Sequence, residues 1–256
     1  MKVLGCLVLL CLAATSRADG LADLQRALET LTQRLPVTGE LAVEVMQKYG
    51  DGDDAVERKG AASARVVDSP EALSLAYGAE LLASLEGEEA QRARDPDVAT
   101  PAKDGVHELS PADARLMVRA RDSLQRSINA AQYLGETEES YEQVPARRLD
   151  FALPISQLAK HERKYVKSYD GVLSVWIDEN GVPLASRTRI DASGRVFIFI
   201  RFHFEVRSDR QFVVHGDRLL ALEDRYYQQS RGAGERSERR VHKTLRVSEG
   251  RDSHSH

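Results

Sequence analysis

Residues that could carry out chemistry are few in this chain of 256 residues, and their spacing matches no catalytic motif. The seven histidines are scattered, and none belongs to an H-E-x-x-H metal motif. The chain also has no G-x-S-x-G nucleophile motif, no phosphate-binding P-loop and no G-x-G-x-x-G dinucleotide motif. We therefore predict a protein that is not an enzyme and that uses no metal or cofactor. An enzyme whose site is assembled from dispersed residues is the alternative.

Both cysteines, Cys6 and Cys11, lie in an apolar segment at the N-terminus. Lys2 precedes the apolar run, which continues to Ala14 and is followed by small residues up to Ala18. This pattern predicts a secretory signal peptide over residues 1–18, cleaved after Ala18, and a protein that is periplasmic or secreted. The apolar run is shorter than the roughly 20 residues that cross a bilayer, so we expect no membrane span. After cleavage, disulfide bonds and cysteine-based zinc sites are excluded.

Charge is unevenly distributed along the chain. Residues 19–140 contain 13 Lys and Arg against 24 Asp and Glu, whereas residues 187–251 contain 15 against 9. We favour the interpretation that the two halves attract each other within one fold; separate acidic and basic surfaces for different partners are the alternative. The basic run at 235–246 could contact phosphate, but it contains no aromatic residue. A solvated strand face is therefore favoured, and we expect no nucleic-acid partner.

The elements that would position any site begin with a helix and a hairpin. Leucines recur at helical spacing over residues 20–35, which predicts an amphipathic helix. Alternating apolar residues over 40–66, around a turn rich in Gly and Asp, predict a hairpin.

Residues 69–135 are predicted to be a helical insertion. The stretch "DPDVATPAKDG" at 95–105 is expected to be a loop within it. The next helix should span 110–134, because Ser110 is a good N-cap, Pro111 suits the first helical position and Gly135 ends the apolar pattern.

From residue 141 onward, strand-like segments alternate with turn residues. The strongest turn signal is Asn180–Gly181, because both residue types tolerate positive φ. Strands joined by tight turns pair antiparallel, so we expect a long meander of seven or eight strands. The expected strands lie at about 147–153, 163–168, 172–178, 182–190, 195–207, 210–215, 218–228 and 237–247.

The most apolar segment after the signal peptide is "RVFIFIRFHFEV", residues 195–206. One of its faces carries apolar residues at every even position from Val196 to Val206. Burying each such side chain is worth roughly 1.5–3 kcal/mol, so this face must be shielded from water. The expected fold is α+β, with a long antiparallel meander that stays open and is covered by two or three amphipathic helices. Trp176 is expected on the opposite, half-exposed side.

Two segments resemble parts of a known group of proteins. The stretch "YEQVPARRLDFALP" (141–154) is a turn that leads into an alternating strand, and "VLSVWIDENGVPLASRTRI" (172–190) is a strand, a turn and a strand. With the N-terminal helix, the early hairpin and the helical insertion, they resemble the LolA/RseB-type superfamily of periplasmic proteins. The resemblance is architectural and covers most of the chain after the signal peptide. It implies an open β half-barrel with helices across its concave mouth.

The same resemblance implies a cavity between sheet and helices that accepts an acyl chain, a lipoprotein or a hydrophobic peptide. Two strands and a helix would line it, with the residues Val175, Ile177, Ile198, Ile200, Phe202, Phe204, Leu116 and Leu124. The alternative is that these side chains form a fully packed core.

We thus expect an exported, non-enzymatic protein that binds a lipophilic ligand or a lipid-linked partner. A protein-interaction or sensor module of the cell envelope, with a closed core, is the alternative. The expected organisation is a signal peptide (1–18), a single domain (19–247) and a disordered tail (248–256).

Overall fold

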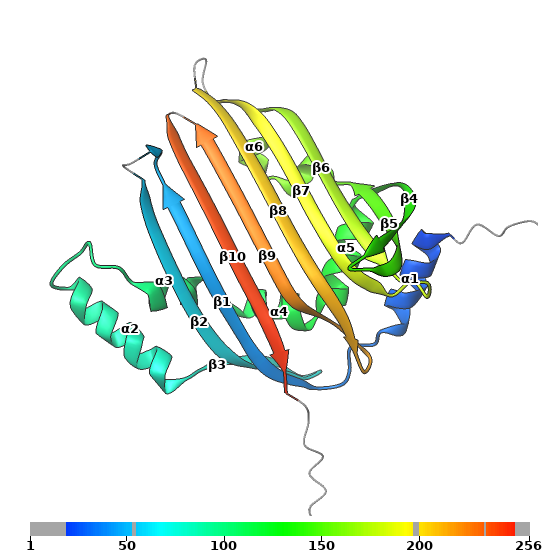
Figure 1. Ribbon diagram of the computed structural model, residues 1–256, viewed down its shortest axis with the longest axis horizontal. Coiled ribbons are helices and arrows are strands. Elements are labelled where there is room, and N and C mark those ends of the chain that lie inside the picture. The colour runs from blue at the N-terminus through cyan, green and yellow to red at the C-terminus, as the bar shows by residue number, and fades with distance from the viewer. Residues whose placement is uncertain (1–18, 53–54, 197–199, 233, 249–256) are drawn as a thin grey trace, which may run out of the picture.

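The computed structural model describes residues 19–52, 55–196, 200–232 and 234–248 (Figure 1). The predicted signal peptide, residues 249–256 of the predicted tail and the predicted cavity residue Ile198 lie outside the described residues. Within those described ranges, no helix is both long enough and apolar enough to cross a membrane.

In the described part of the chain, ten strands form one open antiparallel sheet. They are β1 (Val37–Tyr49), β2 (Val56–Asp68), β3 (Leu73–Tyr77), β4 (Gln132–Tyr141), β5 (Val144–Ala152), β6 (Val166–Ile177), β7 (Pro183–Val196), β8 (Ile200–His215), β9 (Arg218–Gly232) and β10 (Glu235–Val247). The order across the sheet is β3-β2-β1-β10-β9-β8-β7-β6-β5-β4. Neighbouring strands are therefore consecutive in the chain except where β1 pairs with β10. The predicted α+β class and antiparallel open sheet are confirmed.

Some predicted strand boundaries are wrong. The strands expected at 163–168 and 172–178 are the single strand β6, and β8 continues through the turn expected near 208. Residues 191–194, also expected to be a turn, lie within β7. Polar residues at these positions sit in the sheet because they find partners across it. For example, Asp209 pairs with Arg187 of β7, and Asp191 contacts His203 of β8.

The helices lie mostly on one face of the sheet. They are α1 (Gly20–Thr30), α2 (Ala79–Arg92), α3 (Pro101–His107), α4 (Pro111–Val118), α5 (Ala120–Ala130) and α6 (Lys160–Arg163), with a 3-10 turn η2 at Ile155–Gln157. In Figure 1, α3, α4 and α5 lie behind the sheet, whereas α2 extends beside its β2–β3 edge.

The loop predicted at 95–105 is wrong in its second half, which forms α3. Pro101 occupies the start of this helix, where its missing N–H costs nothing. Gly105 then lies directly against β2, since a Cβ there would come within 2.3 Å of the carbonyl carbon of Ala61. Contact between the helix and the strand, which the local sequence does not encode, stabilises α3.

The single helix predicted over 110–134 is also wrong. Its start is correct, because the Ser110 hydroxyl accepts a hydrogen bond from the Asp113 N–H at 3.2 Å. However, the helix is divided into α4 and α5 at Arg119, whose φ of −127° and ψ of 48° are not helical. From Gln132 onward the chain forms β4. Arg119 donates to the Asp68 carboxylate, and this contact outweighs the helical preference of the sequence.

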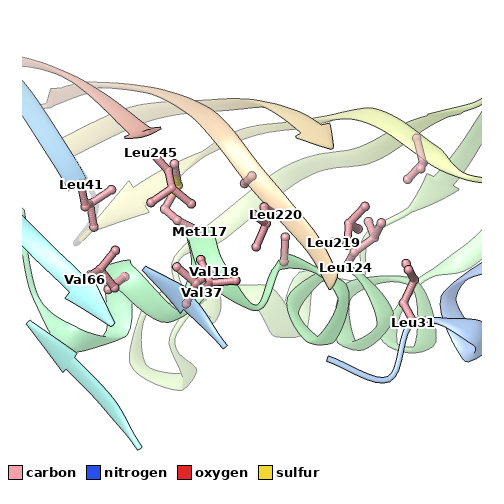
Figure 2. Close-up of a cluster of buried hydrophobic side chains, with 14 of the residues drawn as sticks. Leu31, Val37, Leu41, Val66, Met117, Val118, Leu124, Leu219, Leu220 and Leu245 are labelled. Carbon is pink, nitrogen blue, oxygen red and sulfur yellow. The ribbon is translucent and has the colours of Figure 1, made fainter. Parts of the chain in front are cut away.

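One buried apolar cluster joins the helices to the inner face of the sheet (Figure 2). We call the side of the sheet that carries this cluster the inner face. Leu24 and Leu28 come from α1, and Leu124 comes from α5. They pack with strand residues such as Leu41 and Leu219, each of which is fully buried. Burial of such side chains supplies most of the stability of a fold of this kind.

The opposite, outer face of the sheet carries mainly charged side chains, but Trp176 forms a small buried cluster there with Ala146 and Ala185. Trp176 lies on this face, as predicted, but it is 7% exposed rather than half-exposed. Its ring packs beside Tyr141, with centroids 5.6 Å apart, and beneath the guanidinium of Arg187. The indole N–H donates to Glu139. The β4–β5 hairpin therefore shields a side chain that the alternation pattern places in water.

A buried ion triad connects three distant parts of the chain. Asp68, at the end of β2, accepts hydrogen bonds from Arg218 at the start of β9 and from Arg119 between α4 and α5. Asp68 and Arg218 are both fully buried, and the Arg119 Nη2 to Asp68 Oδ1 distance is 2.6 Å. The Nε of Arg218 also donates to the carbonyl of Leu35. Because one carboxylate serves two guanidinium groups, each partner depends on it.

We predict that Asp68→Ala lowers the free energy of unfolding by about 3–5 kcal/mol, since it leaves Arg218 buried without a counter-charge. Urea denaturation measures this loss. Asp209→Ala is the control, because it removes an exposed ion pair with Arg187 and should cost less than about 1 kcal/mol. Equal losses in the two variants would contradict the importance of the triad.

Candidate ligand-binding groove

A groove with a volume of about 670 Å³ lies on the inner face, near the strand ends that carry the β1–β2, β7–β8 and β9–β10 connections. Phe202 and Phe204 of β8 project into it, and Val196 of β7 and Tyr49 of β1 contribute further apolar surface. The groove thus occupies one end of the face whose other end carries the buried cluster.

Small residues beside the two phenylalanines leave the groove unfilled. In the strand register, Phe202 lies between Gly194 of β7 and Gly232 of β9. Two residues further along β8, Phe204 lies between Ala192 and Ser230. Where the strands continue toward the core, larger side chains replace these small ones: Val206 faces Ile190 and Gln228.

The segment that precedes β6 forms a wall of the groove through Leu158 and Tyr165, and Val166 at the start of β6 continues this wall. The carbonyl of Tyr165 accepts a hydrogen bond from the Arg195 N–H at 3.0 Å. This approach requires glycine at position 194, because a Cβ there would lie 2.0 Å from the Tyr165 oxygen. Arg163 holds the same segment by donating to the carbonyls of Leu158 at 2.8 Å and Ser156 at 3.0 Å.

Beyond the groove, a polar layer connects the sheet to α3. Arg239 of β10 donates to both carboxylate oxygens of Glu108, and its guanidinium lies 5.6 Å from the centre of the Tyr226 ring. Burial raises the pKa of the Tyr226 hydroxyl. The Tyr226 hydroxyl donates to Gln228, so this layer is internally hydrogen-bonded.

A second ion pair ties α4 to β10. Lys243 donates to Asp113 at 2.5 Å. Burial alone would raise the pKa of the Asp113 carboxyl, but hydrogen bonds from Lys243 and Ser110 outweigh it and lower the pKa. Both Asp113–Lys243 and Glu108–Arg239 join the acidic first half of the chain to the basic second half, as the charge distribution suggests.

The rim of the groove is charged but balanced. The lining includes Glu162 and Glu235, together with Arg231 and Arg236. His203 is also next to the groove, but its imidazole lies on the outer face, where Nε2 is 2.8 Å from a carboxylate oxygen of Asp191. No three His, Cys, Asp or Glu side chains in the described ranges are grouped as a metal site requires. An apolar interior with a polar rim suits an amphiphilic molecule.

The structure divides the eight predicted cavity residues into separate groups. Phe202 and Phe204 line the groove. Val175, Ile177 and Leu124 are buried in the core cluster instead.

The other three predicted residues lie elsewhere. Leu116 is half-buried on α4, and Ile200 is 37% exposed near the start of β8. Neither is a lining residue of the groove. Ile198 is outside the described residues.

Sequence reasoning missed the small residues that make the groove, namely Gly194, Ala192, Ser230 and Gly232. Each lies on the inner face opposite a phenylalanine, so a correct strand register would have identified them. It also missed Leu158, which lies in a segment without strand periodicity, and Tyr165, which was expected in the strand at 163–168 but lies just before β6.

Comparison with family models, with curated proteins and with solved structures gives no match. The geometry of the groove is therefore the main guide to its use.

We predict that Gly194→Ala lowers the free energy of unfolding by about 1–3 kcal/mol, because the new methyl group displaces the Tyr165 carbonyl or the Phe202 ring. Thermal and urea unfolding measure the change. Gly87→Ala in α2 is the control. Apart from the backbone of its own helix, no described atom lies within 4 Å of the Cβ position, so the free energy of unfolding should rise by about 0.5–1 kcal/mol. A stable Gly194→Ala variant would show that the wall does not lie against β7.

Proposed function

We propose that this chain is an exported, non-enzymatic protein that binds an acyl chain in the groove, either as a free lipophilic ligand or as part of a lipid-linked partner. The observation that carries the proposal is the groove itself, with its volume of about 670 Å³ and the rings of Phe202 and Phe204 inside it. Protein sites for small molecules typically enclose about 300–1,000 Å³ and are mostly apolar.

The physical reason for choosing an acyl chain is the lining. Phe202 and Phe204 are only half-buried, and Val196 and Val166 are half-buried beside the same space. Each methylene group that moves from water into such a site contributes about 0.8 kcal/mol. Charged groups at the rim would hold a polar head group in water while the chain lies inside.

The proposal includes the architecture that the sequence suggests. We regard the open sheet as a half-barrel of the LolA/RseB type, with the α3–α5 helices across its concave face. Support comes from the core cluster, in which α4 and α5 side chains pack on β9, and from the position of these helices behind the sheet in Figure 1.

The alternative function, an interaction or sensor module with a closed core, has support of its own. Val175 and Ile177 are fully buried and Leu124 is 4% exposed, so the space between α5 and the sheet is filled. Under this alternative the groove would stay empty, and the charged surfaces would bind a partner protein of the cell envelope.

We predict that the purified protein binds cis-parinaric acid, a fluorescent fatty acid, and that palmitate displaces it. Ser237→Trp should weaken binding at least tenfold, because its indole would occupy space within the groove. Thr244→Trp on the outer face of the same strand is the matched control and should bind normally. Fluorescence titration gives both dissociation constants.

Two results would overturn ligand binding. One is a wild-type protein with no affinity for the probe, no co-purified acyl chain in native mass spectrometry and no rise in melting temperature with palmitate. The other is equal loss of affinity in Ser237→Trp and Thr244→Trp. The first result would favour the closed-core module.

Export has a separate test. If cleavage follows Ala18, Asp19 becomes the first residue, and its carboxylate already caps α1 by accepting from the N–H groups of Leu21 and Ala22. We predict that the protein produced in a Gram-negative host appears in the periplasmic fraction. Its intact mass should correspond to a chain that begins at Asp19. A cytoplasmic product that retains Met1 would contradict export.

A further inference from the structure

The end of the sheet beside the groove carries two pairs of arginines that face each other. On the β7–β8 hairpin, Arg195 is directly opposite Arg201. On the neighbouring β9–β10 hairpin, Arg231 is directly opposite Arg236. The two hairpins are adjacent, because β8 pairs with β9. Like charges placed directly opposite each other destabilise a sheet, so an arrangement of four guanidinium groups has an energetic cost.

Glu162 and Glu235 lie at the rim of the adjoining groove, but close ion pairs do little to neutralise the arginines themselves. Across the described ranges, no carboxylate lies within 4 Å of the guanidinium groups of Arg195, Arg201 or Arg231. Arg236 is 3.7 Å from Asp51 and 3.8 Å from Glu238, which are long contacts. Arg195, Arg201 and Arg231 are all exposed, so their charge is directed into solvent.

Apolar side chains lie next to these arginines, one step nearer the end of the hairpin. Val196 is opposite Ile200, and Ile200 is 37% exposed. Val196 also lines the groove. At this end of the sheet, a half-buried valine and an exposed isoleucine on the inner face adjoin arginines on the outer face. This combination fits the boundary of a bilayer, where apolar groups meet the acyl region and guanidinium groups meet phosphates. A nucleic acid or an acidic protein would use the arginines but not the apolar pair.

We propose that this end of the sheet docks on an anionic lipid bilayer through Arg195, Arg201, Arg231 and Arg236. Docking directs the groove toward the membrane surface, since Arg231, Arg236 and Val196 belong to both the docking end and the groove. The surface is a second function of the molecule, and membrane binding through it does not require a ligand in the groove.

The test measures partition of the ligand-free full chain, after signal cleavage, into vesicles. Phosphatidylcholine vesicles with and without phosphatidylglycerol are compared in a flotation assay at low and at high salt. Each basic residue at an anionic surface strengthens binding about fivefold. The double variant Arg195→Ala/Arg201→Ala should therefore bind the anionic vesicles about 30-fold more weakly, and salt should weaken the wild type.

The matched control is Arg189→Ala/Arg207→Ala. This pair also faces across β7 and β8, is exposed and removes two positive charges, but it lies in the middle of the outer face, where Arg207 pairs with Glu205. It should bind the anionic vesicles within about threefold of the wild type, because its guanidinium groups lie away from the docking end. Circular dichroism confirms that both double variants fold.

Three results would overturn the proposal. The first is a wild-type protein whose vesicle binding does not increase with phosphatidylglycerol. The second is an equal loss of vesicle affinity in both double variants. The third is an Arg195→Ala/Arg201→Ala variant that binds anionic vesicles like the wild type. Ser237→Trp should keep full vesicle binding. A failure of acyl-chain binding and a failure of membrane docking are therefore distinguishable.

Discussion

The carboxylate of Asp68 joins parts of the chain that no local interaction could bring together. It pairs with Arg218, 150 positions further on, and with Arg119 at the break between α4 and α5. Through these two arginines, the end of β2, the start of β9 and the turn between two helices meet at one point. Burying the charges of Asp68 and Arg218 is costly, and the cost is recovered only when the geometry is complete. The triad therefore ties the break between α4 and α5 to the sheet, where α4 and α5 contribute to the core cluster.

The same inner face serves two purposes along its length. At the core end, residues on neighbouring strands are large enough to fill the space between sheet and helices, as Leu219 and Leu41 do. At the other end, glycine, alanine and serine flank Phe202 and Phe204, so aromatic rings stand beside empty volume. The polar layer of Glu108, Arg239 and Tyr226 lies between these two regions. Charge-assisted hydrogen bonds fix that layer, so it separates the filled core from the groove.

Alternation of apolar residues was sufficient to predict the sheet class, the first hairpin and the inner orientation of Phe202 and Phe204. It failed where tertiary contacts override local preference. Arg119 interrupts a continuous helical pattern because a buried carboxylate lies within its reach. Asp209 and Asp191 resemble turn residues, but they remain in strands through pairing across the sheet. Val175 and Ile177 share the apolar character of the groove residues, and only the position of α5 decides that they are core. The sequence shows that the core and the groove are both apolar. It does not show the strand register and helix positions that decide which residues belong to which.

The pairing of β1 with β10 has a consequence for the order of assembly. Gly39 lies opposite Val247, so the last strand of the chain is inserted between β1 and β9 in the interior of the sheet. Until that strand is present, the hairpin of β1 and β2 and the sheet from β4 to β9 have no common hydrogen-bonded partner. Contacts of such long sequence separation form slowly. A nascent chain would therefore leave the β1–β2 hairpin and the β4–β9 part of the sheet unjoined until β10 had been synthesised, so the sheet cannot form one strand at a time in chain order.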